Sequence, residues 1–246
     1  MPRSTTLFLS LAGLLLAGGF PRAHAQGLTW GISAGAVRSF VYSRGFSTKG
    51  PSDYVRAEGH WGYQLGAHTE RPLGPKTAVE AAGRWVSTTT TYEVTALVPS
   101  SFPLTHTWRA ARRNYRLSAG VAQVLAARGS KALRVYGGLV AGVETQQLRF
   151  ERPNVSLPAS SLAIAFDYRE PPARAWGVGA EAGVGLRVHR EADLNLRYNY
   201  NFTRTAPIAY TSAITHAGPP GSTQSSTGVI QGRPVFITAE VVFWFK

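Results

Sequence analysis

Hydrophobic and polar residues alternate with a period of two along most of the chain after residue 25. Residues 54–68 show this most clearly, and residues 174–188 repeat it. Every second position from Trp176 to Val188 is apolar, and the positions between them hold glycine, Glu181 and Arg187. Because successive side chains of a β-strand point to opposite faces, this pattern predicts a strand with one apolar face and one polar face.

Seven other segments follow the same pattern, some with more irregularity. We therefore expect eight strands, over residues 28–42, 54–68, 77–91, 109–127, 131–148, 174–188, 193–203 and 235–245. Each segment reaches the roughly 9–11 residues that a tilted strand needs to cross a bilayer.

Short and long connections alternate strictly between these strands. The short ones are His68–Lys76, Arg128–Lys131 and His189–Ala192, and the long ones are 43–53, 92–108, 149–173 and 204–230. This rhythm is typical of outer-membrane barrels, which have short periplasmic turns and long outer loops. The long connections are rich in Pro, Ser, Thr and Gly, which favour irregular, solvated backbone.

The two faces of the predicted strands indicate which side meets lipid. One face is almost purely apolar and aromatic, whereas the other carries glycine and charges of both signs. In a small barrel these charges must pair inside the lumen, because an unpaired buried charge is costly. We expect one lumen network at mid-height, with glycines leaving room for it, made of Glu58, Arg84, Arg116, Glu181, Arg197 and Glu240.

The predicted fold is therefore all-β: a monomeric, closed, antiparallel up-and-down transmembrane β-barrel of about eight strands. A soluble, lipocalin-like secreted barrel is the alternative, but it would place those charges in what should be an apolar core. Aromatic side chains fit the membrane borders. We expect Trp30, Tyr63, Phe243 and Phe245 at the periplasmic border, and Phe40, Tyr42, Trp85, Tyr115, Trp176 and Phe202 at the outer one.

The first 25 residues predict a cleaved signal peptide. Arg3 precedes an apolar run from Leu7 to Phe20, and Ala23-His24-Ala25 forms a small-x-small cleavage site before Gln26. The domain organisation is then a signal peptide at 1–25 and one barrel domain at 26–246. Cysteine is absent, so the exported chain has no disulfides and relies on its strand ladder.

The chain is strongly basic, with a formal net charge of +13, and 13 − 2 = +11 remains after removal of Arg3 and Arg22 with the signal peptide. Such a charge favours anionic partners, and export makes nucleic acid the weakest of these. The predicted outer loops are net basic. We expect a loop patch that contacts phosphates of lipopolysaccharide or another anionic surface molecule, made of Arg109, Arg112, Arg113, Arg149 and Arg152.

These features together resemble the small outer-membrane β-barrel proteins of Gram-negative bacteria: the porin-like or PorT-like family, similar in architecture to OmpX and the OmpA transmembrane domain. The last strand, from Val235 to Phe245, alternates like the terminal strand that the barrel-assembly machinery recognises in such proteins. Lys246 makes its aromatic residue penultimate, which departs from the usual pattern. The resemblance implies an outer-membrane location and no cofactor.

Motifs of the enzymatic outer-membrane barrels are not found. No histidine is followed two positions later by serine, as in lipid A deacylases of the barrel type, and Asp53, Asp167 and Asp193 have no adjacent histidine, as an omptin protease would require. His60 and His68 share a strand but lie roughly 26 Å apart along it, too far to share a metal ion. The glycines of 177–183 echo a dinucleotide fingerprint, but they lie within an alternating strand and are interpreted as space for lumen side chains.

The sequence therefore predicts a non-enzymatic barrel with a structural or interaction role, without metal or cofactor. Its expected partners are outer-membrane lipid, lipopolysaccharide, the barrel-assembly machinery and an envelope protein. Two alternatives stay open: a narrow pore or transport protein, and an accessory subunit of a secretion or surface-assembly system.

Overall fold

The computed structural model describes residues 27–42, 47–49, 53–97, 103–150, 162–169, 174–205, 207–216 and 223–245. These residues form thirteen strands in two antiparallel sheets. The predicted signal peptide lies outside the described residues, so its cleavage stays a prediction.

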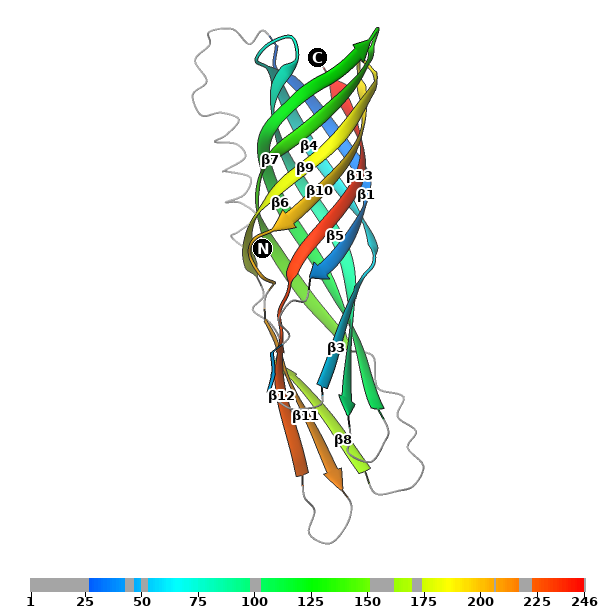
Figure 1. Ribbon diagram of the computed structural model, residues 1–246, viewed down its shortest axis with the longest axis vertical. Helices are drawn as coiled ribbons and strands as arrows, with labels where there is room; N and C mark the ends of the chain where they lie inside the picture. The colour runs from blue at the N-terminus through cyan, green and yellow to red at the C-terminus, as the bar shows by residue number, and fades with distance from the viewer. Residues whose placement is uncertain are drawn as a thin grey trace, which may run out of the picture.

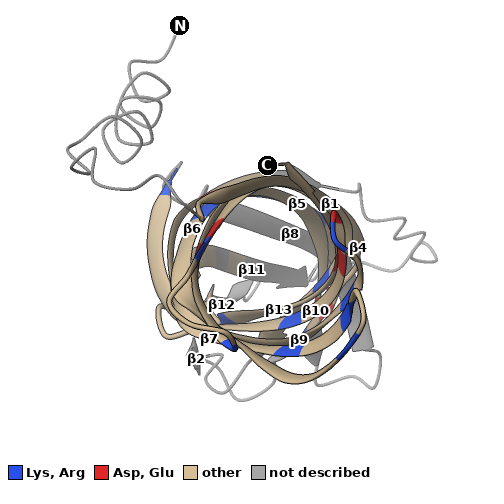
Figure 2. Cartoon of the chain, turned by 90° about the horizontal axis from the view of Figure 1, so that it is seen from above, with Lys and Arg blue, Asp and Glu red and all other residues tan. Residues whose placement is uncertain are grey.

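The larger sheet closes into a barrel. Its strands are β1 (Thr29–Tyr42), β3 (Asp53–Gly59), β4 (Trp61–Pro72), β5 (Thr77–Leu97), β6 (Pro103–Arg128), β7 (Lys131–Phe150), β9 (Ala175–His189), β10 (Ala192–Asn201) and β13 (Arg233–Phe245). β3 and β4 both pair with β5 and together take one place in the ring, so the barrel is eight-stranded. The first and last strands pair from Trp30↔Phe245 to Tyr42↔Arg233, which leaves the barrel without an open edge (Figure 1). Viewed along its axis, the ring is continuous (Figure 2).

The apolar face points outward, as expected for a barrel in lipid. Trp176 is 73% exposed and Leu139 is 69% exposed, whereas Glu240 is 3% exposed and Arg134 is 2% exposed. This inside-out polarity is the opposite of a soluble barrel, whose apolar side chains fill the interior. The predicted all-β transmembrane barrel of eight strands is confirmed.

Connections of different length lie at opposite ends of the barrel. The turns at 73–76, 129–130 and 190–191 join neighbouring strands at one end, which we call the short-turn end. Gly129 adopts a positive φ of 63° there, a conformation that favours glycine in a two-residue turn. β13 ends at the same end of the barrel (Figure 1). The other end carries the long connections.

The long connections contain more strand than the sequence predicts. β5 and β6 continue as a paired ladder from Thr77↔Gln123 to Leu97↔Pro103, through most of the segment that was expected to be a loop. Four further strands form a small second sheet below the barrel in Figure 1, in the order β2 (Ser47–Lys49), β12 (Thr223–Ile230), β11 (Ile208–His216) and β8 (Leu162–Arg169). β11 and β12 contain several threonines and serines, and threonine is a good strand former despite its polarity.

A bulge between β3 and β4 changes which side chains face the lumen. Gly59 pairs with Thr90 and Tyr63 pairs with Ser87, so four steps on one strand match three on the other. A Cβ at Gly59 would lie 1.5 Å from the Ser39 carbonyl oxygen, so only glycine fits this position. One extra residue exchanges the lumen-facing and outward-facing side chains in the part of the strand that precedes the bulge. Glu58 is therefore exposed, which corrects its predicted place in the lumen.

Candidate functional site

A network of ion pairs crosses the middle of the lumen, with Arg197 at its centre. Its three guanidinium nitrogens each donate to a different carboxylate: Nε to Glu240 at 2.6 Å, Nη1 to Glu181 at 2.7 Å and Nη2 to Glu80 at 2.5 Å. The glutamates come from β13, β9 and β5, so one side chain connects opposite walls of the barrel. All five N–H donors of an arginine are arranged in a plane, and this geometry suits such multiple pairing.

Arg84 reinforces the same three carboxylates from the β5 wall. Its Nη1 lies 3.0 Å from Glu181, its Nε 3.4 Å from Glu240 and its Nη2 3.8 Å from Glu80. Nη1 also donates to the Ser118 hydroxyl at 2.9 Å. Removing either arginine would leave carboxylates buried with fewer partners, which is destabilising.

Four of the six predicted lumen charges meet in this network: Arg84, Glu181, Arg197 and Glu240. Glu80 takes the role expected of Glu58, and the sequence contained a signal for it, because Glu80 and Arg84 are four residues apart on one face of a strand. That face also carries Ala78, Ala82 and Val86, which conceals its polar character. Arg116 lies in the lumen, 8% exposed, but forms no ion pair with any carboxylate of the described chain.

Ser33, His68 and Glu80 form a hydrogen-bonded row beside the network. His68 Nε2 lies 2.9 Å from the Ser33 hydroxyl, and His68 Nδ1 lies 3.2 Å from Glu80 Oε1. The order of Ser33, His68 and Glu80 resembles the nucleophile, base and acid of a catalytic triad. His68 is fully buried, however, and Glu80 is already bound by Arg197, so the row has no room for a substrate.

A second group of ion pairs closes the short-turn end. Arg134 donates to Asp193 at 2.9 Å and to Glu70 at 2.6 Å. Arg187 pairs with the other oxygen of Asp193 at 2.8 Å, and the indole nitrogen of Trp244 donates to Asp193 at 2.9 Å. Two arginines therefore balance two carboxylates, and this group was not predicted.

A third group lies in the lumen towards the long-connection end. Arg112 is fully buried, donates to the Tyr92 hydroxyl and has its Nε 3.6 Å from Glu144. The ring of Tyr92 stacks on Trp108, with centroids 5.6 Å apart. This position corrects the prediction that Arg112 belongs to an exposed loop patch, because β6 begins at Pro103 and carries it inside the barrel.

Glycines beside the arginines provide the space that the long side chains need. A Cβ at Gly66 would lie 3.0 Å from Cγ of Arg84, and one at Gly183 would lie 3.1 Å from Cγ of Arg197. The structure thus supports the interpretation of the glycines at 177–183 as space for lumen side chains. The free space beside the central network is a cavity of about 10 Å³, about the size of one water molecule.

The other members of the predicted basic patch lie elsewhere. Arg109 and Arg113 are exposed on the outward face of β6, at odd-numbered positions next to the buried Arg112. Arg149 pairs with Arg109 in the backbone register of β6 and β7, and Arg152 lies outside the described residues. Of the predicted patch, Arg109 and Arg113 thus lie on the surface of the barrel wall.

Aromatic side chains border the apolar belt at both ends. Trp30, Phe243 and Phe245 are exposed near the short-turn end, and Tyr115, Trp176 and Phe202 are exposed nearer the other end. Tyr63 packs edge-on against Trp85, with centroids 5.4 Å apart, so it belongs to the outer border. Its predicted periplasmic position is wrong because Tyr63 lies near the start of β4, far from the turn at 73–76.

The described residues contain no group of three or more His, Asp or Glu side chains that could hold a metal ion. No helix in the described part of the chain is long and apolar enough to cross a membrane.

Comparison with known proteins found no matching family model and no matching curated protein. Among solved structures, the outer membrane protein OprG from Pseudomonas aeruginosa is 14% identical, with 89% of this chain and 96% of that chain covered and a TM-score of 0.48. The outer membrane protein AlkL, studied in lipid bilayers, is 15% identical over 93% and 96%, with a TM-score of 0.41. Ail of Yersinia pestis, in complex with the heparin analogue sucrose octasulfate, is 12% identical over 89% and 100%, with a TM-score of 0.39.

The chain is therefore similar to small outer-membrane β-barrel proteins, the group that the sequence resembles. At these scores the overlays carry no argument about function. The closed ring of eight strands in this chain carries the assignment of the architecture.

Proposed function

We propose that this chain is a non-enzymatic barrel of the Gram-negative outer membrane that contacts the phosphate groups of lipopolysaccharide through arginines on its outer wall. The observation that carries the proposal is the outward position of Arg109 and Arg113 on β6, just beyond the aromatic border at Tyr115. The mid-lumen ion pairs favour a closed barrel, so the surface rather than the lumen meets the partner.

The height of these arginines fits a membrane headgroup layer. Arg113 lies two residues beyond Tyr115, roughly 7 Å along the strand, and Arg109 lies six residues beyond it, roughly 20 Å along the strand. The headgroup region adds about 5–7 Å to each side of the hydrocarbon core, so a tilted strand brings Arg113 to the phosphate level. Arg109 then reaches the sugar and phosphate layer above it.

The chemistry of the wall also suits phosphate. Arg113 lies opposite Ser87 and Thr145, and Arg109 lies opposite Thr91 and Arg149, so their cross-strand partners are three hydroxyl side chains and one further arginine, with no acid among them. Arginine binds a phosphate through two parallel hydrogen bonds, and such charge-assisted bonds are the strong ones. The hydroxyl groups beside them can add hydrogen-bond donors to a phosphate bound at this wall.

Binding of purified lipopolysaccharide to the refolded protein in detergent tests this proposal. The variant Arg109→Gln with Arg113→Gln should bind about tenfold more weakly, the effect of about 1.4 kcal/mol. The matched control is Arg128→Gln with Lys131→Gln, which removes the same charge from exposed positions at the short-turn end. That control should bind like the wild type.

Dephosphorylated lipopolysaccharide separates phosphate recognition from contact with acyl chains. It should bind the wild type as weakly as the intact glycolipid binds the Arg109→Gln, Arg113→Gln variant. Equal loss of affinity in the wall variant and the short-turn control would show that net charge alone attracts the glycolipid, and the proposed wall site would then be wrong.

Among the described residues, burial of the arrangement that most resembles a catalytic site supports the non-enzymatic part of the proposal. Ser33 and His68 are the hydroxyl and base in the most enzyme-like arrangement among the described side chains, and both are buried beside the ion-pair network. A general base needs a substrate proton within hydrogen-bond reach, and the space next to the network holds about one water molecule.

A further inference from the structure

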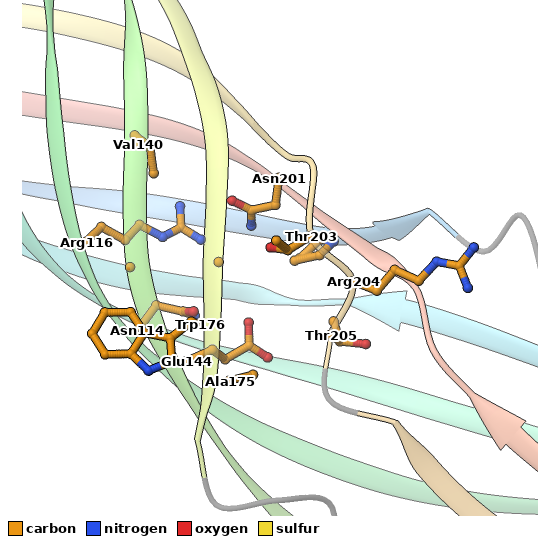
Figure 3. Close-up of a pocket in the computed structure, with 13 residues that line it drawn as sticks. Asn114, Arg116, Val140, Glu144, Ala175, Trp176, Asn201, Thr203, Arg204 and Thr205 are labelled. Atoms are coloured by element: carbon orange, nitrogen blue, oxygen red, sulfur yellow. The ribbon is translucent and has the colours of Figure 1, made fainter.

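A cavity of about 30 Å³ lies in the lumen on the side of the central network that faces the long-connection end. Asn114 and Arg116 of β6, Glu144 of β7 and Asn201 at the end of β10 line it, together with Thr203 (Figure 3). Exposed side chains of Trp176 and Arg204 also line the cavity, so it opens to the surface (Figure 3). Its lining mixes polar and apolar residues and comes from β6, β7, β9, β10, β13 and the segment after β10.

Arg116 is the unusual member of this lining. The residue is 8% exposed, and its Nη2 is buried without a hydrogen-bond partner. Its guanidinium carbon lies 3.6 Å from the ring centroid of Phe236, so an aromatic ring covers one face of the planar group. The N–H donors of a guanidinium point outward in its plane, and stacking leaves them free. Nδ2 of Asn114, on the same face of β6, is also buried without a partner.

No carboxylate of the described residues forms a direct ion pair with Arg116, although Glu144 and Glu181 attract its charge from a greater distance. Glu144 lines the same cavity, but its carboxylate is paired with the buried Arg112 at 3.6 Å. Arg84, the direct cross-strand partner of Arg116, adds positive charge and is engaged with the three central glutamates. Among the described residues of this part of the lumen, two buried arginines, Arg112 and Arg116, thus share one carboxylate, that of Glu144.

Gly142 and Gly177 keep the cavity open. They face each other across β7 and β9, and a Cβ at Gly142 would lie 3.2 Å from Cγ of Arg116, while one at Gly177 would lie 3.0 Å from the Thr203 hydroxyl. Larger residues at either position would push into the side chains that line the site. The space beside the unpaired donors is therefore built into the strands.

We propose that this cavity binds a small monovalent anion of the carboxylate class, held by the guanidinium of Arg116 and the amide nitrogen of Asn114. A buried charge without a counter-charge costs several kcal/mol, and an anion in the cavity removes that cost while satisfying two donors. A planar carboxylate matches the two parallel N–H groups of an arginine. Water would satisfy the donors but would leave the charge uncompensated.

Formate is the probe, because it is the smallest carboxylate. Ligand-observed saturation-transfer NMR on the refolded protein in detergent should give a formate signal that chloride competes away and gluconate, which is too large for the cavity, does not. The signal should fall to background in Arg116→Gln. Arg128→Gln is the control, because it removes one positive charge from an exposed position far from the cavity.

A second variant keeps the proposal testable if Arg116→Gln folds poorly. Asn114→Asp places a carboxylate on the same face of β6 as Arg116, so it should supply the missing counter-charge from within the protein. This variant should fold, as judged by its heat-shifted gel band, and should lose formate binding. A formate signal that persists in Asn114→Asp or Arg116→Gln, or that is absent from the folded wild type, would overturn the proposal.

Discussion

Arg197 illustrates how a single residue can hold the walls of the barrel together. Its side chain starts on β10 and reaches carboxylates on β5, β9 and β13 through three different nitrogens. Lysine has the same charge but only one nitrogen, so it cannot reproduce this geometry. The role of Arg197 thus depends on its shape as much as on its charge.

Replacing Arg197 with methionine should destabilise the folded barrel by about 3–5 kcal/mol, because three glutamates would lose their shared partner in the lumen. Arg197→Lys should fall between this variant and the wild type. Urea titration of the refolded protein, followed by the heat-shifted gel band, measures the change.

Glu58→Gln is the matched control for Arg197→Met. Glu58 is exposed on the outer wall and should change stability by less than about 0.5 kcal/mol. If Arg197→Met unfolded at the urea concentration of the wild type, the central network would contribute no stability. A large effect of Glu58→Gln would instead return that residue to the lumen, where the sequence placed it.

At the scale of the elements, the bulge between β3 and β4 sets the facing of two strand segments. Gly59→Ala should destabilise the barrel by more than about 2 kcal/mol, because the new methyl group would overlap the Ser39 carbonyl oxygen and shift the backbone. Gly137→Ala is the control within another strand, since a Cβ there meets no atom within 4 Å. It should be neutral or slightly stabilising. Equal urea midpoints for the two variants would contradict the observed bulge.

The sequence predicts the barrel strands well where lipid imposes a pattern. The strand expected at 131–148 is observed as Lys131–Phe150, and that expected at 28–42 is observed as Thr29–Tyr42. Beyond the apolar belt no face has to be hydrophobic, so alternation fades although pairing continues. For this reason the sequence predicts loops where the structure has the extension of β5 to Leu97 and the strands β8, β11 and β12.

The lumen network shows why only part of the candidate site can be predicted from the sequence. Period-two alternation places Arg84, Glu181, Arg197 and Glu240 on the inner face correctly. The bulge at Gly59 leaves no visible break in the alternation of residues 54–68, so the sequence predicts the wrong side for Glu58. Ion pairs between strands that are distant in the sequence also cannot be predicted from it. The height of each side chain in the lumen depends on the stagger of the strands, which only the closed barrel defines.

At the scale of the whole molecule, charged groups close the lumen at several heights. The central network joins β5 to β9, β10 and β13. Closer to the short-turn end, Arg134, Glu70, Asp193 and Arg187 form a second closure. Trp244 packs its ring near Arg187 and donates to Asp193, which adds a bulky group to that closure. Two barriers in series must both open before ions can pass.

Planar-bilayer recording of the refolded protein should therefore show no steady conductance in the wild type. Arg197→Ala alone should also stay closed, because the closure at the short-turn end remains. Arg197→Ala combined with Arg134→Ala should give discrete conductance steps, since it removes the central arginine of both barriers. Each variant must first show the heat-shifted band of a folded barrel.

The pattern across these proteins separates a closed barrel from a pore. Discrete steps in the wild type would mean that the ion pairs rearrange in the membrane, and they would favour the pore or transport alternative over a surface role. Conductance steps in Arg197→Ala but not in the wild type would mean that the central network alone closes the lumen. The remaining outcome is no conductance in the wild type and in Arg197→Ala, with conductance steps in the double variant. This outcome would show that the lumen is closed, so the protein would contact its surroundings through its outer wall and the mouth of the barrel.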